Sequence, residues 1–545
     1  MIETFMQYDS FESFEGESSP VADAPYAAGG PWGTTYPTVI AFSYTGNYRI
    51  DVLLDDNDPY AGPIADRRWN YQQDMGSKVT VSYSFMSDVP VYGGNEDIGG
   101  FGFQPFSEAQ KTATREIMAR LSSELGITLI ETSDSAYDYG QIRLGNSNQS
   151  WIQTAGYAWL PNHDGEKSGD VWLDFTFLTN LSPAPGNIGY STLLHEIGHA
   201  LGLKHPGNYN AGDPTSQEPG NYLGTAEDNY AYTVMSYESV AAFQERDWYG
   251  IYDLLALKAL YGRGSWNAGN TTHAFTNADG DILKVIDDTS GVDTIDLSAV
   301  TTGAKLDMRP GTFSSVGLDF RGNPAVDNLS IDFDTSIENF IGTSQADTFI
   351  VGNTPVSGNG SGGLDTVVFT SARGAYQASA SGVTVSVTGS ATNDSFTNVE
   401  RLAFADINLA FDFTGNAGEA ARILGTIFGQ GDNPNPAYAS VLLSYLDNGL
   451  AYEQLMDGAI DFHFGVNHTV TQLVSTIYTN LAGAAPTPQA LDYYSGFITR
   501  GEYTEAQFAV EASNTVFADW IIDFAGQSVT GLAYDRVMDG GSGSA

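Results

Sequence analysis

The sequence predicts a multidomain protein: an α+β domain with a twisted sheet and helices, a β-rich β-roll or sandwich domain, and an all-α domain. Three changes of pattern along the 545 residues support this prediction. Strand and helix spacings come first, then short Val/Ile/Phe runs among Gly, Asp, Asn, Thr and Ser, and finally helical spacing returns. The expected segments are an acidic tail or pro-segment (1–35), the α+β domain (36–262), the β-rich domain (263–412) and a helical module with two repeats and a flexible tail (413–545).

The α+β domain is predicted from alternating and helical spacings. Val79–Phe85 alternates apolar and polar residues, which is typical of a half-buried strand. Ser107 and Gln110 form a capping box that opens a helix, and Gly126 is expected to end it. The other expected elements are strands at Ile127–Glu131, Gln141–Leu144, Ala155–Leu160 and Val171–Asp174, and helices from about Ser191 or Thr192 and from about Asp247 to Leu260.

The composition excludes several classes of protein. There are 66 acidic and 22 basic residues, a net charge of −44, so nucleic acid and anionic membrane surfaces are poor partners. Such acidity suits calcium binding or a salty environment. The absence of cysteine excludes disulfides and thiol catalysis. No apolar stretch is long enough to span a membrane, and the first 20 residues lack a Sec-type signal pattern.

The stretch from residue 195 to 206 contains the pattern H-E-x-x-H-x-x-G-x-x-H. On a helix His195 and His199 lie one turn apart on the same face, and Gly202 lets the chain turn so that His205 can return as a third ligand. Three protein ligands with an open fourth position make a catalytic zinc site. Ordinary buried histidines, or an inactive site that keeps its ligands, are the alternatives.

Three more residues extend this candidate site. Glu196 lies beside the first histidine, within reach of a metal-bound water, and is expected to act as a general base. Met235 precedes a tight turn and can form an apolar floor under the imidazoles, while Tyr237 can direct its phenol toward the metal. A Met and a Tyr are usually core residues, but their place about thirty residues after the histidine motif favours the site.

The motifs resemble those of the serralysin family of metzincin metallopeptidases, which are bacterial secreted zinc endopeptidases. The matching segments are His195–Pro206, Met235–Tyr237, Leu260–Gly262, Tyr83–Phe85, Ala155–Pro161 and Gly169–Leu173. The resemblance covers roughly residues 60–265 and continues weakly to about 370. It implies that Tyr237 stabilises the oxyanion. It also implies export by a type I machinery, although Asp535–Asp539 followed by a Gly/Ser tail matches the expected C-terminal signal poorly.

Substrate binding is assigned to the predicted strand Ala155–Leu160. We expect an extended peptide to pair with this edge through main-chain hydrogen bonds, with Ala155, Tyr157 and Trp159 as the binding residues. Recognition through the backbone predicts broad side-chain specificity.

The β-rich segment contains three degenerate repeats similar to calcium-binding RTX β-roll repeats, at Gly291–Leu297, Gly342–Phe349 and Gly360–Val367. The candidate calcium ligands are Asp293, Asp296, Asp347 and Asp365. Because clean tandem repeats are absent, few or no calcium ions, or an ordinary sandwich with aspartate turns, are alternatives.

The helical segment shows internal similarity. Thr426–Phe428 resembles Thr476–Tyr478, and Gly449 corresponds to Gly501, which indicates two copies of a unit of roughly 50 residues. The unit resembles an uncharacterised helical module of secreted, repeat-bearing bacterial proteins. His463 and His468 are expected to be structural.

The leading hypothesis is therefore a secreted zinc endopeptidase that cleaves proteins or peptides, with Zn²⁺ as catalytic and Ca²⁺ as structural cofactor. One alternative is a surface-attached processing peptidase for a single cell-surface protein. Another is a calcium-binding adhesive protein with a secondary or inactive peptidase domain.

Overall fold

The computed structural model describes residues 44–54, 57–58, 62–63, 67–90, 101–136, 138–150, 154–161, 166–207, 222–240, 244–389, 392–431 and 434–536. The expectations for residues 1–35 and for the C-terminal tail from 537 onward lie outside these ranges. The chain divides into two compact units. Unit 1 comprises residues 1–271, 277–292 and 310–336, and unit 2 comprises 272–276, 293–309 and 337–545.

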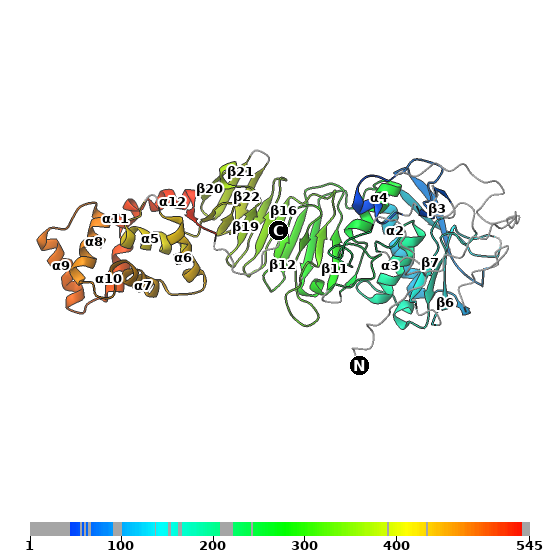
Figure 1. The fold of residues 1–545 in the computed structure, drawn as a ribbon, viewed down its shortest axis with the longest axis horizontal. Helices are drawn as coiled ribbons and strands as arrows, with labels where there is room; N and C mark the ends of the chain where they lie inside the picture. Colours follow the sequence, from blue (N-terminus) through cyan, green and yellow to red (C-terminus); the bar gives the residue numbers. More distant parts are fainter. Residues whose placement is uncertain are drawn as a thin grey trace. The chain divides into compact units, whose positions relative to one another are not determined.

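Unit 1 is built on a six-stranded sheet with the order β5-β3-β6-β8-β7, in which β4 pairs with β6 (Figure 1). The strands are β3 (Val79–Phe85), β4 (Phe101–Gln104), β5 (Ile127–Glu131), β6 (Ile142–Asn148), β7 (Gly156–Ala158) and β8 (Val171–Asp174). Strands β3, β5, β6 and β8 are parallel, whereas β7 is antiparallel to β8. In the described part of the chain, β8 is the strand that pairs with β7, so β7 forms an edge of the sheet. This places the predicted substrate strand at an edge, although β7 is shorter than predicted.

The helices of unit 1 are α1 (Tyr48–Asp51), α2 (Glu108–Glu124), η1 (Leu178–Leu181), α3 (Ile188–Ala200) and α4 (Ile251–Tyr261). The capping box of α2 is confirmed, because Ser107 and Gln110 bond each other's backbone amides. The predicted start of α3 was three or four residues too late, since the Asn187 side chain caps the helix by accepting a hydrogen bond from the Tyr190 amide. Helix α4 begins later than predicted, at Ile251.

Gly126 follows α2 for a different reason from the one predicted. The capping position is Leu125, which has an extended conformation. A Cβ atom on Gly126 would lie 2.1 Å from the carbonyl oxygen of Tyr261, so glycine is required by the close approach of another segment. The sequence pattern had suggested a left-handed helix cap instead.

A second sheet belongs to unit 1 and has the order β14-β15-β11-β9. Its strands are β9 (Glu245–Arg246), β11 (Ile282–Ile286), β14 (Phe313–Ser314) and β15 (Leu329–Ile331), with the 3-10 helix η2 (Asn277–Asp281) before β11. Part of the β-rich segment therefore packs with unit 1, and Val285 contributes to the same hydrophobic core as Leu194 and Ile197 of α3. A two-stranded pair, β1 (Asn57–Asp58) and β2 (Gly62–Pro63), completes the strands described in this unit.

Unit 2 begins with a parallel β-solenoid. Its strands are β10 (Thr272–Thr276), β12 (Thr294–Ala299), β13 (Lys305–Asp307), β16 (Asn339–Ile341), β17 (Thr348–Val351), β18 (Ser357–Asn359), β19 (Thr366–Phe369), β20 (Tyr376–Ser381), β21 (Thr384–Gly389), β22 (Asn393–Thr397), β23 (Arg401–Ala403) and β24 (Asn408–Ala410), with η3 (Arg373–Ala375) before β20. Two sheets run in the orders β10-β12-β16-β18-β22-β21-β20 and β13-β17-β19-β23-β24-β25. Pairing is parallel from β10 to β22 and from β13 to β23. This pairing is typical of a β-roll, because β-sandwiches pair their strands antiparallel.

Phenylalanines fill the inside of this solenoid. The rings of Phe340 and Phe349 stack with centroids 3.8 Å apart, and Phe369 stacks on Phe404 at 5.0 Å. All four side chains are buried. Burial of these aromatic faces supplies a core to rungs that are only three or four residues wide.

The rest of unit 2 is mainly helical. It contains α5 (Asn416–Phe428), α6 (Pro436–Asp447), α7 (Tyr452–Phe464), α8 (Val470–Ala482), α9 (Pro488–Thr499), α10 (Glu505–Ser513), α11 (Val516–Ile521), α12 (Phe524–Thr530) and strand β25 (Leu532–Tyr534), which pairs with β24. The end of α5 corresponds to that of α8, and the start of α6 corresponds to that of α9. Gly429 and Gly483 end α5 and α8 in left-handed conformations, and Pro436 and Pro488 open α6 and α9.

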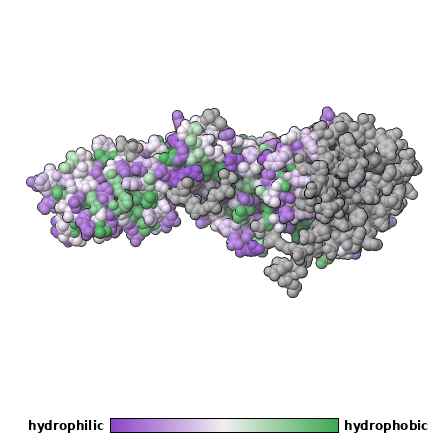
Figure 2. All heavy atoms as spheres, viewed as in Figure 1, coloured by the Kyte–Doolittle hydropathy of each residue, from purple (hydrophilic) through white to green (hydrophobic). Residues whose placement is uncertain are grey.

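The surface of this helical part mixes polar and apolar residues (Figure 2). Its exposed apolar side chains include Val441, Phe462, Val466 and Tyr493. His463 packs its ring against Phe428, and His468 bonds the Glu505 carboxylate at 2.8 Å. None of the described helices is long and apolar enough to cross a membrane.

Candidate metal centre

Three histidines converge at the C-terminal end of α3. His195 and His199 lie one turn apart on this helix, and their Nε2 atoms are 3.1 Å from each other. His205 returns after the helix, so that its Nε2 atom lies 3.1 Å from that of His195 and 3.0 Å from that of His199. The turn depends on Gly202, which has φ +103° and where a Cβ would lie 2.3 Å from the Arg67 carbonyl oxygen. The structure thus brings together the three predicted ligands.

The orientation of the rings shows what this cluster can bind. The Nδ1 atom of His195 lies 2.8 Å from the Val234 carbonyl oxygen, and that of His199 lies 2.7 Å from the Leu203 carbonyl oxygen. A carbonyl accepts a hydrogen bond, so each Nδ1 carries the proton and each Nε2 directs a lone pair at the same point. Burial lowers the pKa of His195 to about 4 and that of His199 to about 3, so both rings are neutral at pH 7. Neutral imidazoles with converging lone pairs fit a zinc ion.

Glu196 is enclosed beside these ligands. Its side chain is buried, and its Oε2 atom makes no hydrogen bond with the described residues. Burial raises the pKa of this carboxyl well above its usual range. An orphaned, buried carboxylate oxygen is costly unless a ligand or water uses it, so Glu196 is suited to exchange protons with a water in the site.

Met235 and Tyr237 lie on the turn that supports the cluster. Met235 is fully buried, and a Cβ on Gly198 of α3 would lie 2.8 Å from its Sδ atom, so the thioether packs directly against the helix. The Tyr237 ring has its centroid 4.5 Å from that of His205 and 5.9 Å from that of His195, and 36% of the residue remains exposed. Tyr237 therefore lies beside the histidines and Met235 beside their helix, and the roles assigned to the two residues stay predictions.

Asp253 holds this turn and was missed by the sequence prediction. Its buried carboxylate accepts hydrogen bonds from the Thr233 hydroxyl, the Val234 amide at 2.8 Å and the Gly250 amide at 2.7 Å. Because the Val234 carbonyl orients His195, Asp253 acts on the metal ligand through a single residue, Val234. The available signal was the place of Asp253 at the third position of α4, where it caps the helix.

The edge strand β7 presents alternate main-chain groups. The Ala155 carbonyl oxygen accepts from the Asp174 amide, and the Trp159 amide donates to the Asp170 carbonyl oxygen. In an antiparallel pair these bonds alternate along the strand, so the main-chain groups of Gly156 and Ala158 face the open edge. The backbone groups of the predicted residues Ala155, Tyr157 and Trp159 thus point toward β8, and the open-edge residues were missed. Substrate binding at β7 stays a prediction.

The four candidate calcium ligands are not gathered into one cluster. The Asp347 carboxylate accepts hydrogen bonds from the amides of Ala304 and Thr343, and Asp365 accepts one from the Asp347 amide. Asp296 accepts from the Ser298 amide, and the Asp293 amide donates to Glu338. In the described part of the roll no three His, Asp or Glu side chains converge on one point, and calcium binding stays a prediction.

A different trio of carboxylates was not foreseen. Asp287, Asp332 and Asp334 of unit 1 bring carboxylate oxygens within 4.8 Å of one another. The ammonium of Lys258, on α4, lies 2.9, 2.5 and 3.0 Å from them respectively, so a cation of the protein already occupies their centre. The sequence carries no signal for this cluster, because the carboxylates come from segments far apart in the chain.

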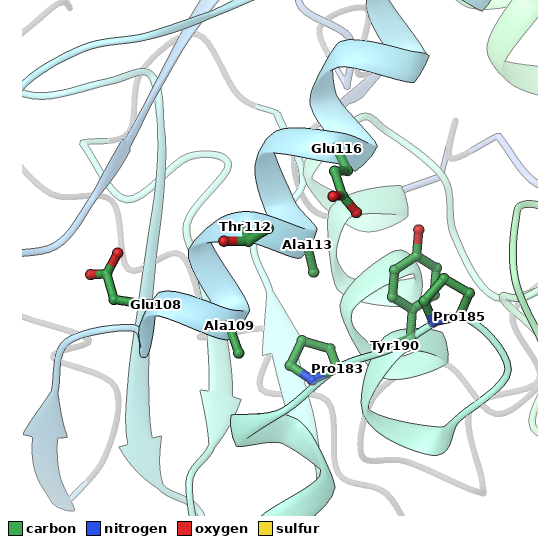
Figure 3. Close-up of a pocket in the computed structure, with 8 residues that line it drawn as sticks. All are labelled: Glu108, Ala109, Thr112, Ala113, Glu116, Pro183, Pro185 and Tyr190. Carbon is green, nitrogen blue, oxygen red and sulfur yellow. The ribbon is translucent and has the colours of Figure 1, made fainter.

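A separate cavity of about 390 Å³ lies between α2 and the start of α3 (Figure 3). Its apolar wall contains Pro183, Pro185 and Tyr190, and Glu108 and Glu116 are at its margin. None of the three histidines lines this cavity, so it does not belong to the metal centre.

The chain is similar to known metallopeptidases. The family model described as "Peptidase M10 serralysin C terminal" matches residues 254–426. The chain is 33% identical to a serralysin from Photorhabdus laumondii over 312 residues, 52% of this chain and 61% of that protein. It is 32% identical to a serralysin from Proteus mirabilis over 332 residues, 54% of this chain and 65% of that protein. It is 30% identical to the metallopeptidase AprA from Pseudomonas marginalis over 338 residues, 57% of this chain and 66% of that protein. The chain spans less than two thirds of the length of these relatives.

Proposed function

Because the chain is related to the serralysin metallopeptidases, we propose that it is a secreted zinc-dependent endopeptidase of the metzincin type that hydrolyses peptide bonds of proteins. The observation that carries the proposal is the convergence of the Nε2 atoms of His195, His199 and His205 within 3.1 Å, beside the buried carboxyl of Glu196. A solely structural cluster does not need an acid with a free oxygen next to it.

The three imidazoles would hold the metal through Nε2, and two of them are kept in the required tautomer by the carbonyl groups of Val234 and Leu203. Zinc held there would polarise the scissile carbonyl and lower the pKa of water toward about 7. Fixing the ligands before substrate arrives lowers the cost of reorganisation during the reaction.

Glu196 would move the proton. Its Oε2 atom is free to accept a proton from the attacking water and to pass it to the leaving amine. Burial raises the pKa of this carboxyl and so makes its carboxylate a stronger base, which favours the first proton transfer from water.

Tyr237 would stabilise the negative charge that develops on the scissile carbonyl oxygen. Its ring lies against His205, and its partial exposure allows the phenol to meet a substrate. A hydrogen bond directed at the developing charge lowers the barrier more than it strengthens substrate binding.

The substrate would lie along β7 as an added strand. The outward main-chain groups of Ala158 supply hydrogen bonds, and they do not depend on the substrate's side chains. We therefore expect cleavage of unrelated proteins with broad sequence preference.

The test compares Glu196→Ala with Glu238→Ala, which replaces an exposed glutamate near the same turn. Zinc content by mass spectrometry and casein cleavage are measured for both variants and for wild type. Wild type and Glu238→Ala should bind one zinc and cleave casein, whereas Glu196→Ala should bind zinc without cleaving. Full activity of Glu196→Ala, or inactive zinc-loaded wild type, would contradict the proposal.

A further inference from the structure

We propose that Gly156 is a positioning residue for Glu196: the missing side chain at this point of β7 leaves the space in which the Glu196 carboxyl is held. The role in catalysis rests on the proposed peptidase function. The contact itself does not, because it is a packing relation between an edge strand and a helix within unit 1.

The contact is close. A Cβ atom built on Gly156 would lie 2.9 Å from Cγ, 2.9 Å from Oε1 and 3.1 Å from Cδ of Glu196. These are the three atoms nearest to that position, and distances below 3.0 Å essentially never occur for a real Cβ. The Glu196 side chain therefore packs on the Cα of Gly156, and any larger residue would have to displace it.

The strand cannot easily retreat from the helix. Gly156 pairs with Leu173 of β8, and the hydroxyl of Thr154 donates to the Gly156 carbonyl oxygen at 2.7 Å. Its neighbour Ala155 is held through its carbonyl oxygen by the Asn180 side chain at 2.8 Å. Gly156 is itself buried. The Glu196 side chain, whose Oε2 atom has no hydrogen bond to described residues, is the more easily displaced partner.

The requirement for glycine is steric and not conformational. Gly156 is absent from the described residues with positive φ, so alanine can adopt its backbone conformation without strain. The cost of Gly156→Ala is therefore the collision with Glu196. Gly156 differs in this respect from Gly202, whose positive φ means that a substitution would also strain the backbone.

Gly156 would thus link the substrate strand to the general base. It lies two residues from Ala158, whose main-chain groups face the open edge of β7, and its Cα supports the carboxyl that exchanges protons with water. The packing at Gly156 then sets the position of the general base relative to the substrate strand. A displacement of about 1 Å at such a site can reduce turnover about 10²-fold.

The kinetic test uses zinc-loaded Gly156→Ala with Gly224→Ala as its matched control. Gly224 is exposed, has no atom within 4 Å of its built Cβ and no strained φ. Gly156→Ala should lower kcat about 10-fold to 100-fold with KM changed less than about 3-fold and zinc content unchanged. Gly224→Ala should behave as wild type. Wild-type kcat for Gly156→Ala would overturn the proposal.

A second measurement does not depend on activity. All three atoms that meet the built Cβ are removed in Glu196→Ala, so a double-mutant cycle isolates the contact. Gly156→Ala should lower Tm by about 3 °C or more in the wild-type background and by less than about 1 °C in the Glu196→Ala background. Equal shifts in the two backgrounds would overturn the proposal even if wild type proved inactive. Unequal shifts with an inactive wild type would keep the contact and reject only the peptidase function.

Discussion

Replacing Lys258 by methionine should destabilise unit 1 strongly, because the lysine neutralises two buried carboxylates and a third that is exposed. The ammonium lies within 3.0 Å of Asp287, Asp332 and Asp334, with its side chain 8% exposed and those of Asp287 and Asp332 each 1% exposed. Burial lowers the pKa of Lys258, but the three carboxylates outweigh it and raise the pKa above its ordinary value. Methionine keeps the length and most of the packing and removes the charge.

Removing one partner of a buried ion pair costs about 3–5 kcal/mol, since the remaining charges stay desolvated. Arg263 still lies 3.3 Å from Asp287 and 2.7 Å from Asp334, so the expected loss is about 3 kcal/mol, the lower end of this range. The control is Lys111→Met, which breaks a pair of similar length, 2.9 Å, with Glu108. That pair is solvated, with Glu108 83% exposed, so its loss should leave the unfolding midpoint close to that of wild type.

Urea unfolding followed by tryptophan fluorescence suits this comparison, because seven of the eight tryptophans precede residue 272 and report on unit 1. Lys258→Met should show a clearly lower midpoint than both wild type and Lys111→Met. Equal urea midpoints for the two variants would refute the reasoning. They would show that burial of an ion pair does not decide how much it contributes to the free energy of unfolding.

Three other predictions follow from the same structure. Tyr237→Phe should lower kcat about 10²-fold with KM nearly unchanged, and steady-state kinetics showing an unaltered kcat would remove the phenol from the mechanism. Burial raises the pKa of the Glu124 carboxyl from 4.5 to about 7, so the folded protein holds the carboxyl proton more tightly than the unfolded chain does. The free energy of unfolding should therefore fall by about 3 kcal/mol as the pH rises from about 4.5 to 7. Glu124→Gln should flatten this dependence in urea midpoints taken across that range, and an unchanged slope would contradict the assignment. Both oxygens of the Asp347 carboxylate and one oxygen of Asp365 already accept backbone hydrogen bonds, so dialysis of the zinc-loaded protein into calcium-free buffer that contains zinc should shift the calorimetric Tm by less than about 2 °C, and a shift above about 10 °C that added Ca²⁺ reverses would establish calcium ligation.

Local patterns predicted the elements whose causes lie within a few residues. The capping box at Ser107 sets the start of α2, and strict alternation defines β3 at Val79–Phe85. Both depend on neighbouring residues in the chain, so the sequence was sufficient. The start of α3 was misjudged because Asn187 and Ser191 are both acceptable caps, and only the structure shows which side chain meets the helix amides.

The sequence by itself determined the metal-binding groups: the spacing of His195 and His199 on a helix, the glycine turn and the return of His205 are local geometry. Tertiary structure decided what surrounds them. Asp253 reaches the turn of Val234, Gly156 comes against Glu196, and Lys258 enters a group of distant aspartates, all through contacts between segments well separated in the chain. Periodicity and motif spacing describe one element at a time, whereas burial, tautomer and steric support arise where elements pack. The physical reason is that close packing and desolvation depend on every neighbour in space, and the order of residues specifies only the neighbours along the chain.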